Sequence, residues 1–295
     1  MIIIHIHYNT KPMKSQLSFE KQIAKKMCHI NIGKVAARRN RCYNEIAPPA
    51  IPASKPRRKE DISMKQLKQM VYEANMELWH RNLVIYTWGN VSQVDRDRGV
   101  VAIKPSGVPY DNLTADMIVV MDLETGRTVE GDLNPSSDAP THLALYRAFG
   151  EIGGVTHTHS PYATAWAQAG RAIPCFGTTH ADYFRGDIPI SRFLTPEETE
   201  DAYEANTGKV IIEAFEGRNP MYTPAILTRG HGPFTWGKSG MDSVHNAVVL
   251  EELAKMGMWS LGLTPDLGAL PQHISDKHFL RKHGPNAYYG QKSSK

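Results

Sequence analysis

The chain has 295 residues, of which 41% are hydrophobic and 22% charged, as in ordinary globular proteins, and this composition argues against wholesale disorder. No apolar run approaches the ~18 residues that a membrane-spanning helix needs, and the start of the chain is too short and too rich in histidine for a signal peptide. The cysteines Cys28, Cys42 and Cys175 form no CxxC pair, which argues against a disulfide framework or thiolate zinc site and favours a cytoplasmic location.

Charge is divided unevenly along the chain. Residues 1–63 hold 13 Lys/Arg against 4 Asp/Glu, while the remainder carries a net charge of −5. The basic clusters and the Pro-rich run at 48–52 predict an extended or disordered leader. It is open to interpretation as a nucleic-acid or membrane-surface tail, as a targeting peptide, or as upstream sequence read through before a true start at Met64. We favour the third, because helical patterning begins there.

Secondary-structure patterns begin at Met64. Apolar spacing predicts a helix over residues 64–80, with Ser63 as its N-cap. β-Branched and aromatic residues predict a strand over 83–87, and further strands end at Asp95 and cover 100–103. Residues 117–121 and 127–130 flank a Glu-Thr-Gly turn, which predicts a hairpin.

The second half of the chain mixes helices and strands without regular alternation. Strands are predicted around the His157-Thr158-His159 run and at 209–213 and 225–228. Because no repeated βαβ unit appears, we expect residues 64–295 to form one α/β domain with a mostly antiparallel or mixed sheet covered by helices. The predicted helices are 140–149, with a proline in its first turn, 161–170, one opening at 195–198, 241–258 and 271–282.

The histidines of the His-x-His run are candidate metal ligands. If the run is a strand, His157 and His159 point to the same face, where two imidazoles suit a metal such as zinc; a pair of surface or core histidines is an equal alternative. His231, between two glycines, and Asp138 are further candidates. Taken singly, a turn residue and a helix N-cap explain these two better. Together the set suits zinc, manganese, iron or cobalt, ions that polarise carbonyls and stabilise enediolates.

Small polar residues also recur at strand ends and before a helix. Backbone N–H groups, hydroxyls and a lysine can cradle a phosphate. Each segment taken alone is explained by an ordinary turn. The occurrence of three such segments is what favours a phosphate site. The candidates are Gly89-Asn90, Lys104, Ser106-Gly107 and Ser136-Ser137.

Four residues are candidates for acid–base chemistry: Asp182, Glu204, His278 and Tyr289. Composition alone does not select among them. Asp182 is open to interpretation as a turn or capping residue, and Tyr289 as a docking aromatic.

These stretches, in this order, resemble the L-ribulose-5-phosphate 4-epimerases of the class II aldolase/epimerase family. The resemblance covers essentially all of residues 64–291 and none of residues 1–63. The segments that carry it are Thr87-Trp88-Gly89-Asn90-Val91-Ser92, Lys104-Pro105-Ser106-Gly107, Pro135-Ser136-Ser137-Asp138-Ala139-Pro140-Thr141-His142, His157-Thr158-His159-Ser160, Gly177-Thr178-Thr179-His180-Ala181-Asp182-Tyr183-Phe184, His231-Gly232-Pro233-Phe234, Leu280-Arg281-Lys282-His283-Gly284 and Tyr288-Tyr289-Gly290-Gln291.

The resemblance implies a sheet sandwiched between helix layers, and a homotetramer with active sites between neighbouring subunits. It implies one divalent metal ion per subunit, Zn²⁺ in the first place, and a sugar-phosphate substrate held by the polar segments named above. It assigns the roles of proton donor and acceptor to Asp182 and Tyr289 of an adjacent subunit. Thr178, Glu204 and His278 are implied as supporting residues. The implied metal ligands are Asp138, His157, His159 and His231.

The implied reaction is C4 epimerisation of L-ribulose 5-phosphate to D-xylulose 5-phosphate, in pentose catabolism of the arabinose or ascorbate type. Cleavage of the C3–C4 bond gives a dihydroxyacetone enediolate and glycolaldehyde phosphate, which recombine on the other aldehyde face. Related aldolases usually carry, at the position of Asp138, a glutamate that acts as a general base. The aspartate found here is one methylene shorter and fits a metal-ligand role better, which favours an epimerase over an aldolase. The rivals are a class II sugar-phosphate aldolase and, from another class, a nucleic-acid-binding protein with structural histidines.

Overall fold

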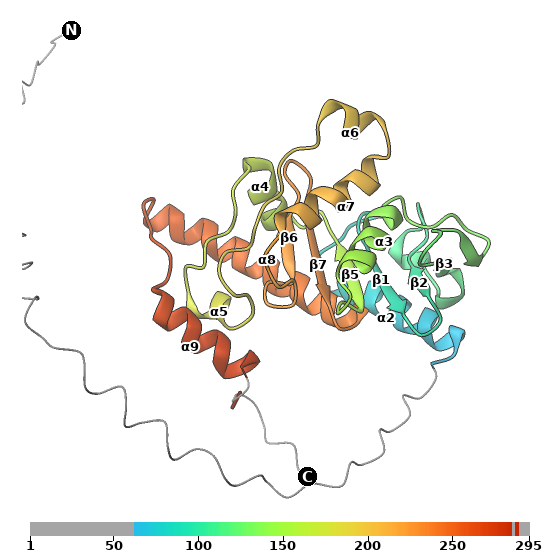
Figure 1. Cartoon of the computed structure of the whole chain (residues 1–295), viewed down its shortest axis with the longest axis horizontal. Coiled ribbons are helices and arrows are strands. Elements are labelled where there is room, and N and C mark those ends of the chain that lie inside the picture. The colour runs from blue at the N-terminus through green and yellow to red at the C-terminus, as the bar shows by residue number, and fades with distance from the viewer. Residues whose placement is uncertain (1–61, 285–286, 289–295) are drawn as a thin grey trace, which may run out of the picture. The chain divides into compact units, whose positions relative to one another are not determined.

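Seven strands form one antiparallel sheet, in the order β4-β3-β2-β1-β5-β7-β6 (Figure 1). The structure is a computed structural model that describes residues 62–284 and 287–288, which fall within one compact unit of the chain. The strands are β1 (Asn90–Asp95), β2 (Val100–Ile103), β3 (Val119–Asp122), β4 (Thr128–Glu130), β5 (Gly154–His157), β6 (Ala225–Leu227) and β7 (Pro233–Gly237).

The strand register aligns polar residues at one end of the sheet. β1 pairs with β2 on one side and with β5 on the other. Asn90, the first residue of β1, lies opposite His157, the last residue of β5, and His157 in turn lies opposite Phe234 of β7. Residues far apart in the sequence therefore meet where β1 begins and β5 ends.

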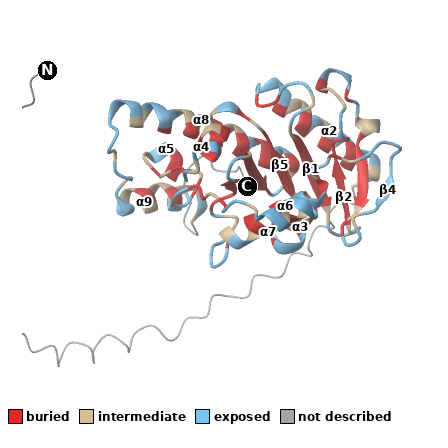
Figure 2. Ribbon diagram, turned by 90° about the horizontal axis from the view of Figure 1, so that it is seen from above, coloured by how far each residue is buried: buried red, intermediate tan, exposed pale blue. Residues whose placement is uncertain are grey.

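Helices cover both faces of the sheet (Figure 2). On one face Val91 packs with Ala74 and Val244 of two long helices, and on the other Phe234 packs with Tyr146 and Phe215. The predicted α/β domain, with a sheet sandwiched between helix layers, is confirmed. The helices are α2 (Met64–His80), α3 (Ala139–Ala148), α4 (Pro161–Ala169), α5 (Thr178–Ala181), α6 (Pro196–Glu200), α7 (Tyr203–Ala214), α8 (Gly240–Leu263) and α9 (Gln272–His283), with short 3₁₀ turns η1 (Tyr110–Asn112) and η2 (Ala115–Met117).

Several element boundaries follow directly from local sequence signals. α2 has the predicted bounds and N-cap: the Ser63 hydroxyl accepts a hydrogen bond from the Gln66 backbone N–H (3.2 Å), and the Gln66 side chain accepts one from Ser63 N–H (2.7 Å). This reciprocal pair is a capping box. α4 ends at Gly170, which adopts the left-handed conformation that glycine tolerates best. The predicted hairpin is present as β3 and β4.

Two predicted strands are wrong. Residues 83–85 are irregular and 86–87 form a turn, in which Tyr86 has a φ of +53° and the Trp88 N–H donates to the Ile85 carbonyl. Residues 209–213 lie within α7, although the run is rich in β-branched residues. Tertiary packing overrides that local preference, because α7 lies against α3 so closely that a Cβ on Gly208 would stand 2.7 Å from the Cβ of Ala144.

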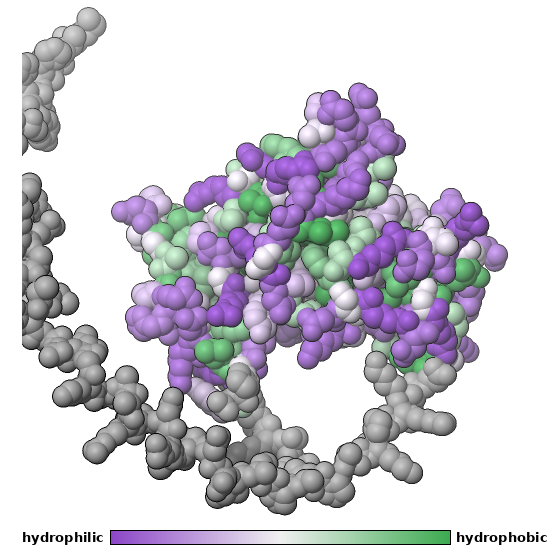
Figure 3. Space-filling view, viewed as in Figure 1, coloured by the Kyte–Doolittle hydropathy of each residue, from purple (hydrophilic) through white to green (hydrophobic). Residues whose placement is uncertain are grey.

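The leader assigned to residues 1–63 falls almost wholly outside the described residues, so it remains a prediction. Within residues 62–284 and 287–288, no helix is both long enough and apolar enough to cross a membrane. On the face shown in Figure 3, hydrophilic and hydrophobic residues are interspersed.

Candidate active site

Three imidazole rings meet where β5 ends. His157 is the last residue of β5, His159 lies two residues beyond it, and His231 lies in the loop before β7. The ring centroids form a triangle with sides of 4.8, 4.8 and 4.9 Å. One nitrogen from each ring lies within 4.8 Å of the other two. The structure thus brings together the three histidines predicted to be metal ligands.

Neighbouring groups fix the orientation of His157. Its Nδ1–H donates to the carbonyl of Pro233 at 3.0 Å, since a carbonyl can only accept. Its ring stacks on Phe234, with centroids 4.2 Å apart and planes 17° apart. The other ring nitrogen, Nε2, lies 3.1 Å from Nε2 of His159. A backbone carbonyl that orients a histidine in this way is the usual partner of a metal-binding imidazole.

Two glycines allow the loops to approach these histidines. Gly89 has a φ of +71°, and a Cβ there would stand 2.7 Å from the carbonyl oxygen of His157. A Cβ on Gly232 would stand 2.6 Å from the carbonyl oxygen of Thr158. Both distances are too short for a side chain, so glycine is required at each position.

Asp138 lies beside the histidines at the start of α3. Although it occupies the N-cap position, its side chain makes no capping hydrogen bond. Instead one carboxylate oxygen accepts a hydrogen bond of 2.7 Å from the Asn90 amide. Burial acts to raise the pKa of Asp138, but His157, His142 and Asn90 together outweigh it, so the net pKa is lowered. The carboxylate is therefore ionised at neutral pH.

The three histidines fit a divalent cation, and Asp138 lines the same cavity as two of them. Burial first, then His157 and His159, lower the pKa of His231 to about 4, and burial also lowers that of His159. Neutral imidazoles and an ionised carboxylate are the forms that bind metal. Two nitrogens on a tetrahedral zinc ion would be ~3.3 Å apart, close to the 3.1 Å found here. Nδ1 of His231 is buried and has no hydrogen-bond partner among the described residues.

A cavity of about 580 Å³ opens beside the histidines. Its lining includes every residue predicted to contact phosphate, together with Asp138, His159 and His231. Residues not anticipated from the sequence also contribute. The lining residues are Thr87, Trp88, Gly89, Asn90, Lys104, Pro105, Ser106, Gly107, Ser136, Ser137, Asp138, His159, Tyr203, Glu204 and His231.

Hydrogen bonds join the polar segments of this cavity. The Ser136 N–H donates to the Lys104 carbonyl and the Ser106 N–H to the Asn134 carbonyl, both at 3.0 Å. The Asn90 amide donates to the Ser136 hydroxyl at 3.0 Å, in addition to its bond with Asp138. Segments that are separate turns in the sequence therefore form one polar wall.

Lys104 is buried in this wall, with 1% of its surface exposed. Its ammonium group donates to the Val108 carbonyl at 2.6 Å and lies 4.8 Å from the ring centre of Tyr110. Burial lowers the pKa of Lys104 to about 8, so the group remains mainly protonated at pH 7. It supplies the cavity with a positive charge.

The sequence also matches a known family. A family model described as the class II aldolase and adducin N-terminal domain matches residues 69–258. The chain belongs to this family. Class II aldolases use a divalent metal ion, and His157, His159 and His231 can hold one.

Solved structures of this family share the fold. An L-fuculose 1-phosphate aldolase is 25% identical, with a TM-score of 0.63, and the match covers 74% of this chain and 96% of that one. YgbL from Klebsiella pneumoniae, described as a putative aldolase/epimerase/decarboxylase, is 26% identical with a TM-score of 0.58, covering 72% and 97%. An L-fuculose-1-phosphate aldolase from Thermus thermophilus, 22% identical with a TM-score of 0.53 over 69% and 98%, shows the fold alone.

Asp182, predicted to transfer protons, does not line this cavity. It directly follows α5 and is held by α9: Arg281 donates to both carboxylate oxygens at 2.9 and 2.6 Å, and His278 contacts one of them at 3.0 Å. Burial acts to raise the pKa of Asp182, but Arg281, His278 and Lys282 outweigh it and lower it. The chain thus gathers Asp182 and His278 in a second cluster, separate from the cavity.

Other residues named from the sequence lie in different places. Glu204 lines the cavity, and its carbonyl accepts a hydrogen bond of 2.6 Å from the Thr141 hydroxyl. Thr178 is the first residue of α5. Tyr289 lies outside the described residues, so its role remains a prediction.

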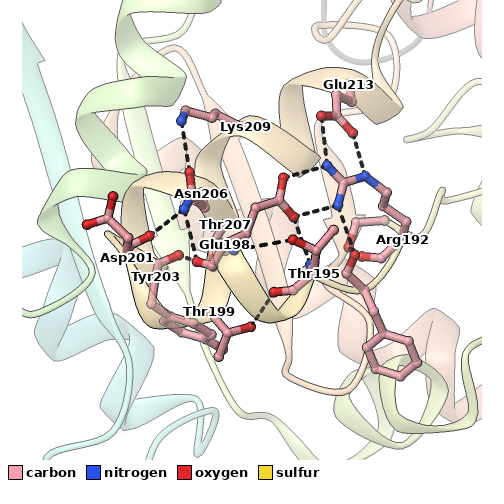
Figure 4. A network of polar contacts seen from close by, with 12 residues as sticks. Arg192, Thr195, Glu198, Thr199, Asp201, Tyr203, Asn206, Thr207, Lys209 and Glu213 are labelled. Atoms are coloured by element: carbon pink, nitrogen blue, oxygen red, sulfur yellow. Dashed lines mark hydrogen bonds and ion pairs between the residues drawn. The ribbon is translucent and has the colours of Figure 1, made fainter.

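Tyr203 lines the cavity but was not singled out from the sequence. It opens α7, directly after Ala202, whose φ is +53°, and its ring centre lies 6.4 Å from that of His231. Figure 4 shows the polar network around it, in which Arg192 pairs with Glu198 at 2.7 Å and with Glu213 at 2.9 Å. These ion pairs tie α6 to α7 and so help to hold Tyr203 at the cavity. No motif in the sequence marks this position.

His142 was also missed as a separate candidate, although it lies four residues after Asp138. It is fully buried, and burial lowers its pKa to about 3. Nδ1 lies 2.7 Å from the Ser92 hydroxyl, which lies 2.8 Å from the Tyr146 hydroxyl. The spacing of four residues on a predicted helix is a signal that could have linked it to Asp138.

Proposed function

We propose that the chain is a metal-dependent epimerase that converts L-ribulose 5-phosphate to D-xylulose 5-phosphate by retro-aldol cleavage and re-addition at C4. One observation carries the proposal: a single cavity of about 580 Å³ is lined by Asp138, by His159 and His231 of the histidine triangle, and by the polar wall described above. Family membership supports enzymatic chemistry of this type. Because the family description also includes adducin, the three convergent imidazoles are what favours an enzyme.

The metal would be held by Asp138, His157, His159 and His231, and we propose Zn²⁺ because the set is nitrogen-rich and can be tetrahedral. A divalent ion there supplies a Lewis acid that stabilises the negative charge of the enediolate formed by C3–C4 cleavage. Asp138 acts as a ligand and not as a base in this scheme. Its bond to Asn90 holds the carboxylate beside the histidines and limits its reach toward the substrate.

The polar wall would hold the phosphate of the substrate. The hydroxyl groups of Ser106, Ser136 and Ser137, with the ammonium group of Lys104, can retain the glycolaldehyde phosphate fragment while its carbonyl turns. Retention distinguishes an epimerase from an aldolase, because both break the same kind of bond. A site that held the aldehyde weakly would release it.

Asp182 and Tyr289 would transfer the protons on opposite faces of the aldehyde. Because Asp182 does not line the cavity of its own chain, this role requires a neighbouring subunit, and we propose a homotetramer with its sites between subunits. The hydrogen bonds from His278 and Arg281 would hold the carboxylate in position toward that neighbour. Tyr289→Phe should lower turnover by ~10²–10⁴-fold and leave metal content unchanged.

The first experiment incubates the full chain with L-ribulose 5-phosphate, with and without a chelator, and follows D-xylulose 5-phosphate. Formation of the epimer only in metal-replete protein supports the proposal. No epimer from metal-replete protein contradicts it.

A mixing experiment tests the shared site. We would assemble oligomers from Asp182→Asn and His231→Gln subunits, each inactive alone. Mixed oligomers should regain activity, because some sites would combine an intact Asp182 with an intact histidine triangle. If mixing restores nothing although mixed oligomers form, the two groups do not act across a subunit boundary.

A class II sugar-phosphate aldolase is the second candidate. It is favoured by the L-fuculose 1-phosphate aldolase that is 25% identical over 96% of its length. Accumulation of free glycolaldehyde phosphate and dihydroxyacetone, without D-xylulose 5-phosphate, would favour it. Cleavage of L-fuculose 1-phosphate would do so more directly.

A further inference from the structure

A buried hydrogen-bonded chain lies behind the candidate metal site. It joins the Tyr146 hydroxyl, the Ser92 hydroxyl and Nδ1 of His142, with contacts of 2.8 and 2.7 Å. All three side chains are 0% exposed. The far end of the chain, Nε2 of His142, is buried and has no hydrogen-bond partner among the described residues. Such an atom in a native core calls for an explanation.

The hydroxyl groups determine the direction of this chain. A hydroxyl carries one proton, and each buried proton needs an acceptor. Among the described residues the Ser92 hydroxyl is the one hydrogen-bond partner of the Tyr146 hydroxyl, so the tyrosine proton goes to Ser92. The Ser92 proton then goes to Nδ1 of His142. If the direction were reversed, the Tyr146 proton would have no acceptor in the described part of the chain.

This direction selects the tautomer of His142. Because Nδ1 accepts from Ser92, a neutral imidazole must carry its proton on Nε2. The unpartnered atom is therefore an N–H donor inside the protein core. It cannot bind a cation in this form, because its lone pair is occupied by the proton.

The charged group nearest in sequence to this donor is Asp138. The two residues are four positions apart at the start of α3, which places their side chains on one face, and the His142 N–H bonds to the Asp138 carbonyl. Each side chain lies within electrostatic range of the other. Asn90 occupies only one oxygen of the Asp138 carboxylate, at 2.7 Å. The other oxygen is available to a second donor.

We propose that His142 is a positioning residue for Asp138, and that its Nε2–H donates to the Asp138 carboxylate in the metal-loaded protein. The carboxylate would then be held between Asn90 and His142, with its free lone pairs directed at the ion. Tyr146 and Ser92 act one step further back by fixing the tautomer. The inference rests on the metal site of the proposed function and is independent of which sugar phosphate is the substrate.

Two substitutions distinguish the role of Nδ1 of His142 from that of Nε2. His142→Gln keeps an amide donor near the position of Nε2, whereas His142→Asn keeps a group near Ser92 and removes the donor toward Asp138. Loss of an outer hydrogen-bond partner typically weakens metal affinity by 10–100-fold. We therefore expect roughly that loss in His142→Asn and a loss of less than ~5-fold in His142→Gln.

The measurement is zinc affinity of the full chain by competition with a chromophoric chelator, with no sugar present. His180→Asn is the control, because His180 is another buried histidine, but its Nε2 bonds to the Gly186 carbonyl at 2.8 Å and not to the metal site. It should leave zinc affinity unchanged. Equal affinities for wild type, His142→Asn and His142→Gln would overturn the inference. A wild-type chain that binds no zinc would instead overturn the metal site itself.

A second measurement avoids substitutions that prevent folding. In the zinc-loaded wild-type chain with ¹⁵N-labelled histidine, the resonances of His142 report which nitrogen carries the proton. We expect protonated Nε2 and unprotonated Nδ1. Protonation of Nδ1 would overturn the inference even if every variant failed to fold.

Discussion

Nε2 of His157 and Nε2 of His159 lie 3.1 Å apart, although only His157 belongs to strand β5. Two imidazole nitrogens at this distance repel one another through their lone pairs, unless one carries a proton or both bind the same ion. Nδ1 of His157 already donates to the Pro233 carbonyl, so the neutral ring has no proton for Nε2. Either Nε2–H of His159 donates to Nε2 of His157, or both nitrogens bind the same ion, which is the arrangement that a metal site requires.

Metal binding should stabilise the folded chain. An ion present at 100 times its dissociation constant adds ~2.7 kcal/mol to the free energy of unfolding if it binds only the native state. We expect this stabilisation in wild type and its loss in His159→Gln, measured by urea unfolding with zinc and with EDTA. His273→Gln, at an exposed position on α9, is the control and should behave as wild type. Equal zinc stabilisation in His159→Gln would contradict the assignment of His159 as a ligand.

Gly89→Ala should destabilise the chain more than Gly99→Ala. Both glycines have positive φ angles, +71° and +67°, so alanine is strained at each by ~1–2 kcal/mol. A Cβ at Gly89 also clashes with the His157 carbonyl and Val84, whereas nothing lies within 4 Å at Gly99. Such overpacking adds ~1–3 kcal/mol. Urea unfolding in EDTA measures the difference, and equal losses would show that the close approach is not required.

Stability should fall as the pH decreases below 6.5. Burial lowers the pKa of His142 to about 3 and that of His180 to about 4, from an ordinary 6.5. The unfolded chain therefore binds more protons, so the stabilisation is complete above pH 6.5 and is lost as the pH falls toward these folded pKa values. Each such histidine contributes at most ~1.4 kcal/mol per pH unit.

The free energy of unfolding in EDTA, measured between pH 7.5 and 4.5, checks this slope. His180→Gln should make this pH dependence smaller by the contribution of one histidine, because glutamine does not titrate. The glutamine amide can still donate to the Gly186 carbonyl, so the fold should be kept. A stability that stayed constant from pH 7 to pH 5 would show that these imidazoles are not neutral in the folded chain.

Asp182→Asn should abolish turnover without affecting the metal. Loss of a general acid or base typically lowers the rate by ~10²–10⁴-fold. Because Asp182 lies in the cluster with Arg281 and His278, and not in the cavity, zinc content should match wild type. Asp276→Asn on α9 is the control for activity, because its side chain makes only an exposed hydrogen bond with Gln272, which the asparagine oxygen can still accept. A fall in zinc content in Asp182→Asn would point to a structural role.

Ser63→Ala should destabilise α2 by ~1 kcal/mol, the typical value for removal of an N-cap. Alanine removes the hydroxyl that accepts from the Gln66 N–H, but keeps the backbone N–H that donates to the Gln66 side chain. Ser63→Asp keeps an acceptor and should retain most of the stability, as measured by thermal unfolding. If alanine and aspartate are equivalent, the cap contributes nothing measurable.

Local sequence signals succeeded where neighbouring residues determine the conformation. The 3.6-residue apolar period and Ser63 gave the bounds of α2, and Pro140 and Gly170 marked a helix start and a helix end. They failed at residues 83–87 and 209–213. In both runs β-branched residues favoured a strand locally, but packing against distant parts of the chain decided the outcome.

The sequence by itself determined the kinds of side chain available: imidazoles, a carboxylate, and three short segments rich in backbone donors. Only the tertiary structure decided that Asn90, His157 and Asp138 meet, because strand pairing and the bond from Asn90 to Asp138 join segments far apart in the sequence. It also placed Asp182 in a separate cluster and Tyr203 at the cavity. Such placements depend on long-range packing, which no local pattern records.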